Sequence, residues 1–253
     1  MGYMLEIKEI YKTFNKGTIN EKAALTGTSL NLNPGDFVTI IGGNGAGKST
    51  MLNAIAGVWN VDSGNIIVDG TDITRLPEHK RAVYLGRVFQ DPMTGTAATM
   101  SIEENMAIAA RRGARRGLRW GISRKERENY KEQLKELDLG LEERLSTKVG
   151  LLSGGQRQAV TLLMAAMKKP KLLLLDEHTA ALDPKTAAKV LDISDKIIEE
   201  HQLTALMVTH NMKDAIAHGN RLIMMHEDGL YMMCPERRKG IFTYRIFWQN
   251  LRK

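Results

Sequence analysis

Cysteine is almost absent from this sequence, since Cys234 is the only one among 253 residues. A single thiol excludes an internal disulfide, and it excludes the cysteine clusters that structural zinc sites need. Such a composition is typical of a protein that works in a reducing compartment. We interpret Cys234 as an incidental thiol rather than a reactive group.

Long apolar runs are also missing. The longest ones, such as those at residues 172–175 and 159–167, end well before the roughly 18 residues that a bilayer-spanning helix requires. We therefore expect any role at a membrane to depend on a partner protein.

Acidic residues are scarce in one segment in particular. Residues 111–127, RRGARRGLRWGISRKER, hold eight Arg or Lys and a single acid, within a chain of net charge +7. Two interpretations are open: a solvated helix and loop, or a surface near lipid headgroups or a membrane protein's cytoplasmic loops, where each basic residue gains roughly 1 kcal/mol beside anionic lipid. Trp120 is the only aromatic residue in the segment, so a stacking surface for single strands is lacking and we expect no nucleic-acid partner.

The apolar fraction of 43% is large enough for a substantial core, and its pattern changes period along the chain. Short apolar runs predict strands at residues 4–10, 20–32, 37–41, 66–68, 83–89, 172–175, 204–208 and 221–225. Helical patterns occupy residues 51–56, 184–200 and 213–218, and most of the stretch from about 100 to 167, including 125–137 and 156–167. Strands that alternate with helices predict an α/β fold with a parallel sheet and right-handed crossovers, interrupted by a helical insertion.

A glycine-rich stretch at residues 42–49, GGNGAGKS, matches the phosphate-loop pattern G-x-x-x-x-G-K-[ST]. It follows a predicted strand and opens a predicted helix, as the pattern requires. Small residues let consecutive backbone N–H groups wrap phosphates, and the helix directs its positive end at them. We expect Lys48 to reach the β- and γ-phosphates and the Ser49 hydroxyl to ligate Mg²⁺. The pattern predicts a nucleoside-triphosphate site without saying which class of NTPase carries it.

A second motif narrows the class. Residues 152–156 read LSGGQ, a Ser/Gly turn directly before a helix and therefore another potential anion site. With both motifs present, the sequence resembles the ATP-binding-cassette (ABC) family, whose signature is LSGGQ. The resemblance covers essentially Met4 to Met225, with every element in the family's order.

The resemblance implies a fold: a P-loop NTPase core of the RecA-like type with a mostly parallel sheet, an N-terminal antiparallel β part and an inserted α-helical subdomain. We expect a single nucleotide-binding domain over residues 1–253. Within it, the catalytic core and β part occupy 1–90 and 168–228, the helical subdomain about 91–167, and an atypical tail 229–253.

The resemblance also implies roles for residues that follow the predicted strands. Asp176 resembles the Walker B aspartate that is oriented onto Mg²⁺, and Glu177 resembles the general base that polarises the attacking water. Gln90 resembles the Q-loop glutamine, which contacts Mg²⁺ and the water and joins the core to the helical lobe. His210 resembles the switch histidine that holds the γ-phosphate, and Asp183 ends a stretch that resembles the D-loop at the dimer interface.

The expected site therefore has three overlapping sets of residues. The catalytic set is Glu177, His210, Gln90 and Lys48. The metal ligands are Ser49, Gln90 and Asp176. The residues expected to contact ATP are Phe14, Gly42, Gly43, Asn44, Gly45, Ala46, Gly47, Lys48, Ser49, Thr50, Ser153, Gly154, Gly155, Gln156 and Asp183. Phe14 is the aromatic that we expect to stack on adenine, with Tyr11 as the alternative.

Two positions depart from the family's usual pattern. His178 stands where proline is common after the catalytic glutamate, and Ala180 stands where Ser or Gly is common. Neither change removes a phosphate or metal ligand, so we expect activity to be kept. We interpret His178 as a simple substitution, although its place beside the attacking water leaves a role open.

The function implied by the resemblance is that of an ATP-hydrolysing transporter subunit, working as a head-to-tail homodimer with two ATP molecules between the phosphate loop of one chain and the LSGGQ of the other. Its partners would be integral membrane permease subunits and a substrate-binding protein, at the cytoplasmic face of the cell membrane, where the chain would be peripheral. Residues 151–160 and 176–186 look like a bacterial importer group, linked in some cases to aromatic amino acids. The alternatives are an exporter subunit and a soluble ABC ATPase of translation or chromosomes, although this chain has one cassette and no sustained heptads.

The end of the sequence, DGLYMMCPERRKGIFTYRIFWQNLRK, lacks helical or strand periodicity of useful length. We expect that it is not the family's usual C-terminal element. Two explanations are open, a shifted reading frame in the coding sequence and a divergent terminal extension.

Overall fold

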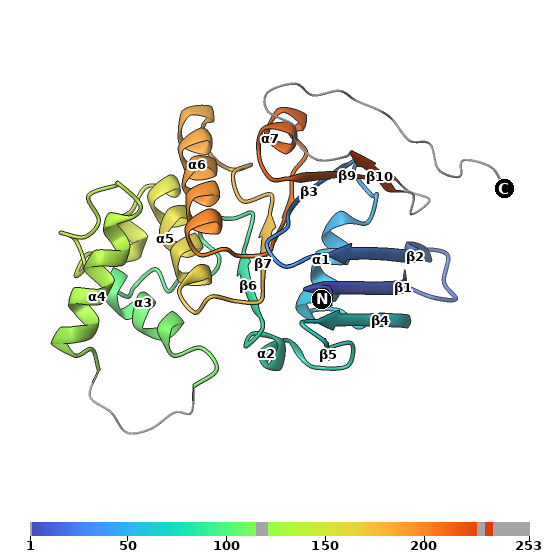
Figure 1. Cartoon of the computed structure of the whole chain (residues 1–253), viewed down its shortest axis with the longest axis horizontal. Helices are drawn as coiled ribbons and strands as arrows, with labels where there is room; N and C mark the ends of the chain where they lie inside the picture. The colour runs from blue at the N-terminus through green and yellow to red at the C-terminus, as the bar shows by residue number, and fades with distance from the viewer. Residues whose placement is uncertain (1, 115–120, 227–230, 235–253) are drawn as a thin grey trace.

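The computed structural model describes residues 2–114, 121–226 and 231–234. Two β-sheets with their covering helices occupy one part of the molecule, and helices α3 and α4 lie at the opposite end (Figure 1). This arrangement confirms the expected P-loop NTPase fold, with a mostly parallel sheet, an antiparallel β part and inserted helices.

The central sheet has the strand order β10-β9-β3-β8-β7-β6. All neighbouring strands pair in parallel except β10 and β9, which are antiparallel. The strands are β3 (Phe37–Gly42), β6 (Leu85–Val88), β7 (Leu172–Asp176), β8 (Ala205–Val208), β9 (Arg221–Met225) and β10 (Tyr231–Cys234). Because helices cover both faces, β3, β7 and β8 are buried almost throughout and read as unbroken apolar runs in the sequence.

The second sheet is antiparallel, with the order β2-β1-β4-β5. Its strands are β1 (Leu5–Phe14), β2 (Lys22–Leu32), β4 (Ser63–Val68) and β5 (Thr71–Asp72). Leu5, Ile7 and Ile10 of β1 are buried in the same apolar cluster as Val38 and Met51. One face of this sheet therefore packs on the core, and the first strand of the chain is fixed beside the helix that follows the phosphate loop.

The helices divide between the two faces of the central sheet. They are α1 (Lys48–Ala56), α2 (Glu78–Arg81), α3 (Ile102–Ala110), α4 (Arg124–Lys135), α5 (Gly154–Ala166), α6 (Pro184–Glu200) and α7 (Met212–Ala217), with a short 3₁₀ helix, η1 (Val149–Leu151). Leu172 and Leu174 of β7 share an apolar cluster with α1, whereas Leu173 and Leu175 share one with α5 and α6. Alternating side chains of one strand thus place α1 and α5 on opposite faces.

Helices α3 and α4 begin at serines whose side chains cap them. Ser101 and Ser123 each accept a hydrogen bond from the backbone of the glutamate three residues later, and that glutamate's side chain accepts one in return. Three arginines of the basic segment also hold these helices in place. Arg111 pairs with Glu126, Arg112 donates to the carbonyl of Ala165, and Arg127 pairs with Glu103 at 2.6 Å. Residues 115–120 lie outside the described residues, so a lipid-facing role for this segment stays a prediction.

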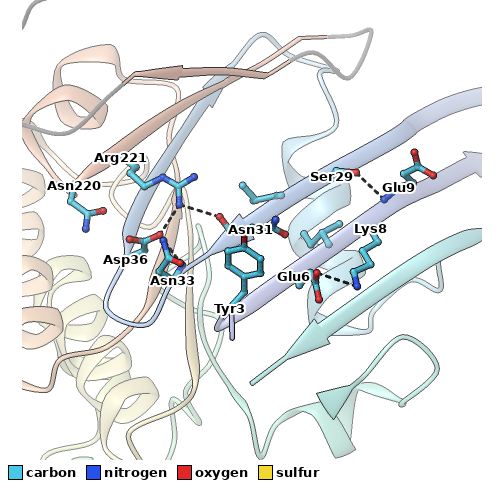
Figure 2. Close-up of a pocket in the computed structure, with 12 residues that line it drawn as sticks. Tyr3, Glu6, Lys8, Glu9, Ser29, Asn31, Asn33, Asp36, Asn220 and Arg221 are labelled. Carbon is cyan, nitrogen blue, oxygen red and sulfur yellow. Dashed lines mark hydrogen bonds and ion pairs between the residues drawn. The ribbon is translucent and has the colours of Figure 1, made fainter. Parts of the chain in front are cut away.

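Arg221 of β9 ties the two sheets together at the edge where β3 begins. Its guanidinium donates to the Asp36 carboxylate at 2.6 Å and to the Asn31 carbonyl at 3.0 Å (Figure 2). A polar groove of about 980 Å³ opens here, with Tyr3 and Glu6 among its lining residues. Since Asp36 precedes β3 and the phosphate loop follows it, this groove lies at the edge opposite the predicted site.

The last strand predicted from the sequence was at residues 221–225, yet Tyr231–Cys234 forms a further strand, β10. This strand pairs with β9 over four residue pairs, from Tyr231 opposite Met225 to Cys234 opposite Leu222. Four residues are too few to show the alternation of apolar and polar side chains that predicts a strand. Strand β9 provides the edge with which they pair. Residues 235–253 lie outside the described residues, and both explanations of the tail stay hypotheses. Among the residues that are described, none of the helices has both the length and the apolar character that crossing a bilayer requires.

Candidate nucleotide site

Four strands of the central sheet end at one edge, and the predicted site residues follow them. Ile40 of β3 and Asp176 of β7 both lie opposite Val208 of β8, and Val88 of β6 lies opposite Leu175. The carboxyl edge of a parallel sheet is where α/β proteins bind ligands. The sheet therefore brings the phosphate loop, Gln90, Asp176–Glu177 and His210 to a common edge.

The phosphate loop connects β3 to α1 through two left-handed glycines. Gly45 has a φ of 88° and Gly47 a φ of 91°, and a side chain at Gly47 would also meet the Ala24 carbonyl. The first helical hydrogen bond runs from the Met51 N–H to the Gly47 carbonyl, and no side chain caps α1. The N–H groups of residues 48–50 precede that bond and have no helical acceptor. They form a row of donors at the positive end of the helix, which suits an anion.

Lys48 is almost completely buried beneath this loop. Its ammonium group donates to the carbonyl of Gly42 at 2.7 Å and to that of Gly43 at 3.1 Å. These bonds hold the charge at the loop, where a phosphate would meet it. Ser49, by contrast, is exposed, and its hydroxyl is accessible to a ligand.

Asp176 has a partner that the sequence analysis missed. Arg87 of β6 donates to Asp176 Oδ2 at 3.1 Å and to the side-chain oxygen of Asn53, on α1, at 2.8 Å. Burial raises the pKa of the Asp176 carboxyl, and the Arg87 hydrogen bond opposes that rise. Within the described part of the chain, Oδ1 of Asp176 has no hydrogen-bond partner, so it is available to a ligand. The signal in the sequence was an arginine inside the apolar run of residues 85–89.

Glu177 and His210 meet across the ends of β7 and β8. His210 Nδ1 lies 3.3 Å from Glu177 Oε2, and the imidazole is largely exposed. Glu177 has a φ of 45°, and its N–H donates to the Val208 carbonyl. A left-handed backbone is unfavourable for a residue with a side chain, which marks this turn as one that its surroundings must hold.

Gln90 lies exposed just beyond β6, in a segment that α5 holds from both sides. Gln158 of α5 donates to the Phe89 carbonyl at 2.9 Å, and Arg157 donates to the Met93 carbonyl at 2.9 Å. Arg157 is only 2% exposed. The sequence analysis missed both anchors, because contacts between α5 and this segment are distant along the chain. They make the position of Gln90 depend on that of α5.

The LSGGQ turn is not brought to the phosphate loop within one chain. Ser153 caps α5: its Oγ accepts from the Gln156 N–H, and Gln156 Oε1 accepts from the Ser153 N–H at 3.1 Å. Ser153 and Gly154 are exposed, while Gly155 packs against the methyl group of Thr186 on α6. Since α5 and α1 cover opposite faces of the sheet, this turn lies away from the phosphate loop of its own chain.

Two aromatic residues pack together at the end of β1. Phe14 lies edge-on to Trp59, with ring centroids 4.8 Å apart, and the Lys12 ammonium lies 5.5 Å from the Phe14 ring. Trp59 follows α1 and was missed in the sequence analysis, where nothing local marks it. The ring of Tyr11 ends over Gly27 instead. Of the two aromatic candidates, Phe14 is the one linked to the phosphate-loop helix.

His178 turns away from Glu177 and into the core. It is 1% exposed, and its Nε2 lies 3.0 Å from Ser194 Oγ on α6. Burial lowers the pKa of His178 to about 4, so the imidazole is neutral at physiological pH. Asp183, five residues on, caps α6 by accepting from the Thr186 N–H at 3.1 Å.

Comparison with known proteins shows which proteins this chain is similar to. Residues 25–180 match the family described as ABC transporter. The chain is 43% identical over 240 residues to a tyrosine transport ATP-binding protein of Clostridioides difficile (strain R20291), covering 95% of each. It is 34% identical over 250 residues to the spermidine/putrescine import ATP-binding protein PotA of Pasteurella multocida (strain Pm70), covering 96% of this chain and 62% of that longer protein.

Solved structures of ABC transporter proteins are also similar to this chain. An ABC transporter cassette solved as a dimer in a post-hydrolysis state with ADP and Pi is 31% identical, with a TM-score of 0.74 over 89% of this chain and 95% of that one. The protein cbiO1 of Clostridium perfringens, part of an ABC transporter complex, is 26% identical with a TM-score of 0.75, over 90% of this chain and 86% of that one.

Proposed function

Because this chain belongs to the ABC transporter family as one of its ATP-binding, ATP-hydrolysing subunits, we propose that it energises a bacterial importer of an aromatic amino acid. The observation that carries the ATP-hydrolysing part of the proposal is the meeting of Lys48, Asp176, Glu177 and His210 at one edge of the sheet. The 43% identity to a tyrosine transport subunit over 95% of both chains supports the compound.

ATP binding begins at the phosphate loop. The backbone N–H groups at the start of α1 bind the phosphate oxygens, and Lys48 leaves the Gly42 and Gly43 carbonyls to reach the β- and γ-phosphates. Phe14 stacks on the adenine, with Trp59 buttressing its ring from the side. Residues Gly42 to Thr50 are thus the phosphate-binding set.

The residues at this edge suit Mg²⁺. Asp176 offers the oxygen Oδ1 while Arg87 holds Oδ2, and Ser49 offers a hydroxyl. Mg²⁺ prefers such oxygen ligands and is usually held by one or two protein groups together with phosphates and water. When bound, Mg²⁺ neutralises charge on the phosphates. Gln90 completes the set of residues that would hold it.

Glu177 acts as the general base in this proposal. Its carboxylate accepts a proton from the attacking water, and the fixed turn at the end of β7 keeps it beside the metal-binding carboxylate. His210, whose Nδ1 lies 3.3 Å from Glu177 Oε2, is the residue that donates a hydrogen bond toward the γ-phosphate in this proposal. The water must be in line with the γ-phosphate, so both side chains contribute by positioning.

The LSGGQ turn completes the site of a second copy. Ser153, Gly154, Gly155 and Gln156 lie at an exposed helix start on the other face of the sheet from α1, so a head-to-tail homodimer is the arrangement that brings them to a bound phosphate. Asp183 lies beside this surface, at the start of α6.

A permease docks between the two lobes in this account. We propose that residues of about 91–167 form a helical subdomain, and a groove of about 1300 Å³ opens between it and the core. Phe89, Ile108 and Met164 line the groove together with Arg87. The lining suits an amphipathic helix of a membrane protein, and it adjoins the segment of Gln90. The chain would then be peripheral at the cytoplasmic face, working with a substrate-binding protein.

Uptake by cells tests the proposal directly. Cells that carry this chain with the permease and substrate-binding protein that are recovered with it should accumulate labelled tyrosine, and cells with the Lys48→Met chain should not. Labelled spermidine serves as the comparison compound, because the PotA relatives are named for it. Uptake of spermidine but not of tyrosine would overturn the aromatic amino acid as the compound, and export of either would overturn the importer assignment, while both leave the ATPase in place.

A further inference from the structure

The turn after β7 has a single buried side chain. Of residues 177–183, His178 alone is buried, while Ala180, Ala181 and Asp183 are exposed. Glu177, Thr179, Ala180 and Leu182 line a hollow of about 390 Å³ that also reaches His210. Since His178 does not line that hollow, the turn has open space on one side and its one buried side chain on the other.

The anchor is a hydrogen bond whose direction can be assigned. Ser194 Oγ donates to the Val190 carbonyl at 2.8 Å, so its single proton is used within α6. The contact of 3.0 Å with His178 Nε2 therefore has the imidazole N–H as donor and Ser194 Oγ as acceptor. Both residues are at most 1% exposed, so the bond is shielded from solvent.

Glu177 needs such an anchor. Its φ of 45° is strained for a residue with a side chain, and a strained backbone persists only where its surroundings fix it. On the strand side, the Glu177 N–H donates to the Val208 carbonyl. On the other side, the next residue is His178, which binds α6.

We propose that His178 is a positioning residue, which fixes the Glu177 carboxylate and the turn to Asp183 by tethering them to Ser194 of α6. Without the tether, the turn is free to relax into the hollow. Glu177 then moves away from its place 3.3 Å from His210, and the general base no longer faces the attacking water. Nucleotide binding at the phosphate loop does not depend on this turn.

The test removes the bond from either side. We expect His178→Leu to lower kcat for ATP hydrolysis at least tenfold while the KM for ATP stays within about twofold. Ser194→Ala should lower kcat in the same direction, and it serves if the His178→Leu chain does not fold. His178→Gln, which again presents an N–H donor, should restore most of the lost kcat.

A matched control separates positioning from general loss of stability. Thr74→Val removes a buried hydrogen bond, from the Ile66 N–H, in the antiparallel sheet. At temperatures where both chains are equally folded, Thr74→Val should leave kcat unchanged. Equal kcat losses in Thr74→Val and His178→Leu, or a His178→Leu kcat within twofold of the starting chain, overturn the proposal.

This inference rests on the proposed role of Glu177, so Glu177→Gln belongs in the same assay. If His178 acts through Glu177, adding His178→Leu to Glu177→Gln slows hydrolysis no further. Full turnover by Glu177→Gln refutes the base assignment. A dead Glu177→Gln beside a fully active His178→Leu refutes the positioning role alone.

Discussion

Helices α1 and α5 both begin after a turn of small residues, but the N–H groups at their starts are satisfied differently. At α1, no side chain caps the helix, and the N–H groups after Gly47 are left for a ligand. At α5, the side chains of Ser153 and Gln156 close a reciprocal capping box on the helix's own N–H groups. One turn is ready for phosphate in a single chain, whereas the other is satisfied until a ligand displaces part of its cap.

The surroundings of the two turns strengthen this contrast. The phosphate loop has Lys48, Asp176, Glu177 and His210 at the same edge of the sheet. The contact that marks the LSGGQ turn is instead the packing of Gly155 on Thr186. In the proposed head-to-tail dimer, the first turn belongs to the catalytic half-site of one chain and the second completes the site of the other copy.

The largest expected effect of a substitution is at the phosphate loop. Lys48→Met removes the ammonium charge beneath the loop, and we expect both ATP binding and hydrolysis to fall, the latter by about 10²–10³-fold, because charge on the phosphates loses its counterion. Binding of a fluorescent ATP analogue to the single chain, measured beside phosphate release, checks this. Tight binding by the variant would contradict the role of Lys48.

At the LSGGQ turn, the expected effect separates binding from hydrolysis. Gly155→Ala places a methyl group into the Thr186 side chain, so α5 shifts from α6. We expect ATP binding by the single chain to be unchanged and hydrolysis to fall at least about tenfold. Binding of the same fluorescent analogue and the rate of phosphate release, measured side by side, check this.

Thr186→Ser provides the matched rescue for that variant, since it removes the threonine methyl group that the side chain added by Gly155→Ala would strike. The double variant should regain most of the hydrolysis rate. No recovery, or a loss of ATP binding in Gly155→Ala alone, would contradict the separation of the two turns.

Burial of His178 also makes the stability of the folded chain depend on pH. Its pKa is lowered from 6.5 to about 4 in the folded chain, so unfolding takes up a proton when the pH falls below 6.5. The stability that the neutral imidazole contributes is complete above pH 6.5 and is lost as the pH falls toward 4, by about 3 kcal/mol at most. Denaturant titrations of the starting chain and of His178→Gln from pH 7.5 to 4.5 check this. Parallel stability curves would contradict it.

The smallest expected effect concerns the cap of α5. Ser153→Ala removes the acceptor for the Gln156 N–H, and we expect it to lower the free energy of unfolding by about 1 kcal/mol. Gln156→Ala opens the other half of the box and should cost a similar or smaller amount. Denaturant titrations of both variants measure these losses. An unchanged stability in both would mean that the capping box is not formed in solution.

Local patterns carried much of the prediction. Residues 42–49, 152–156 and 176–177 are contiguous motifs whose spacing alone fixes which groups adjoin, and the unbroken apolar runs at 37–41 and 172–175 were found as the buried strands β3 and β7. What the sequence did not provide lies in contacts between distant segments. Arg87 on Asp176, Gln158 on Phe89 and Trp59 on Phe14 join elements that only the fold brings together.

The direction of the His178 side chain could not be predicted from its neighbours in the sequence either. Its neighbour in sequence is the predicted general base, which suggested a place beside the water, yet the turn directs the side chain to Ser194 instead.

The most direct measurement of the central claim mixes two chains that are each impaired at a different turn. Lys48→Met retains an intact LSGGQ turn, and Gly155→Ala retains an intact phosphate loop. In a head-to-tail dimer of the two, one composite site is intact, so single-turnover phosphate release should reappear on mixing. If the mixture stays as inactive as either chain alone at concentrations where the two associate, the two turns do not complete each other across a dimer.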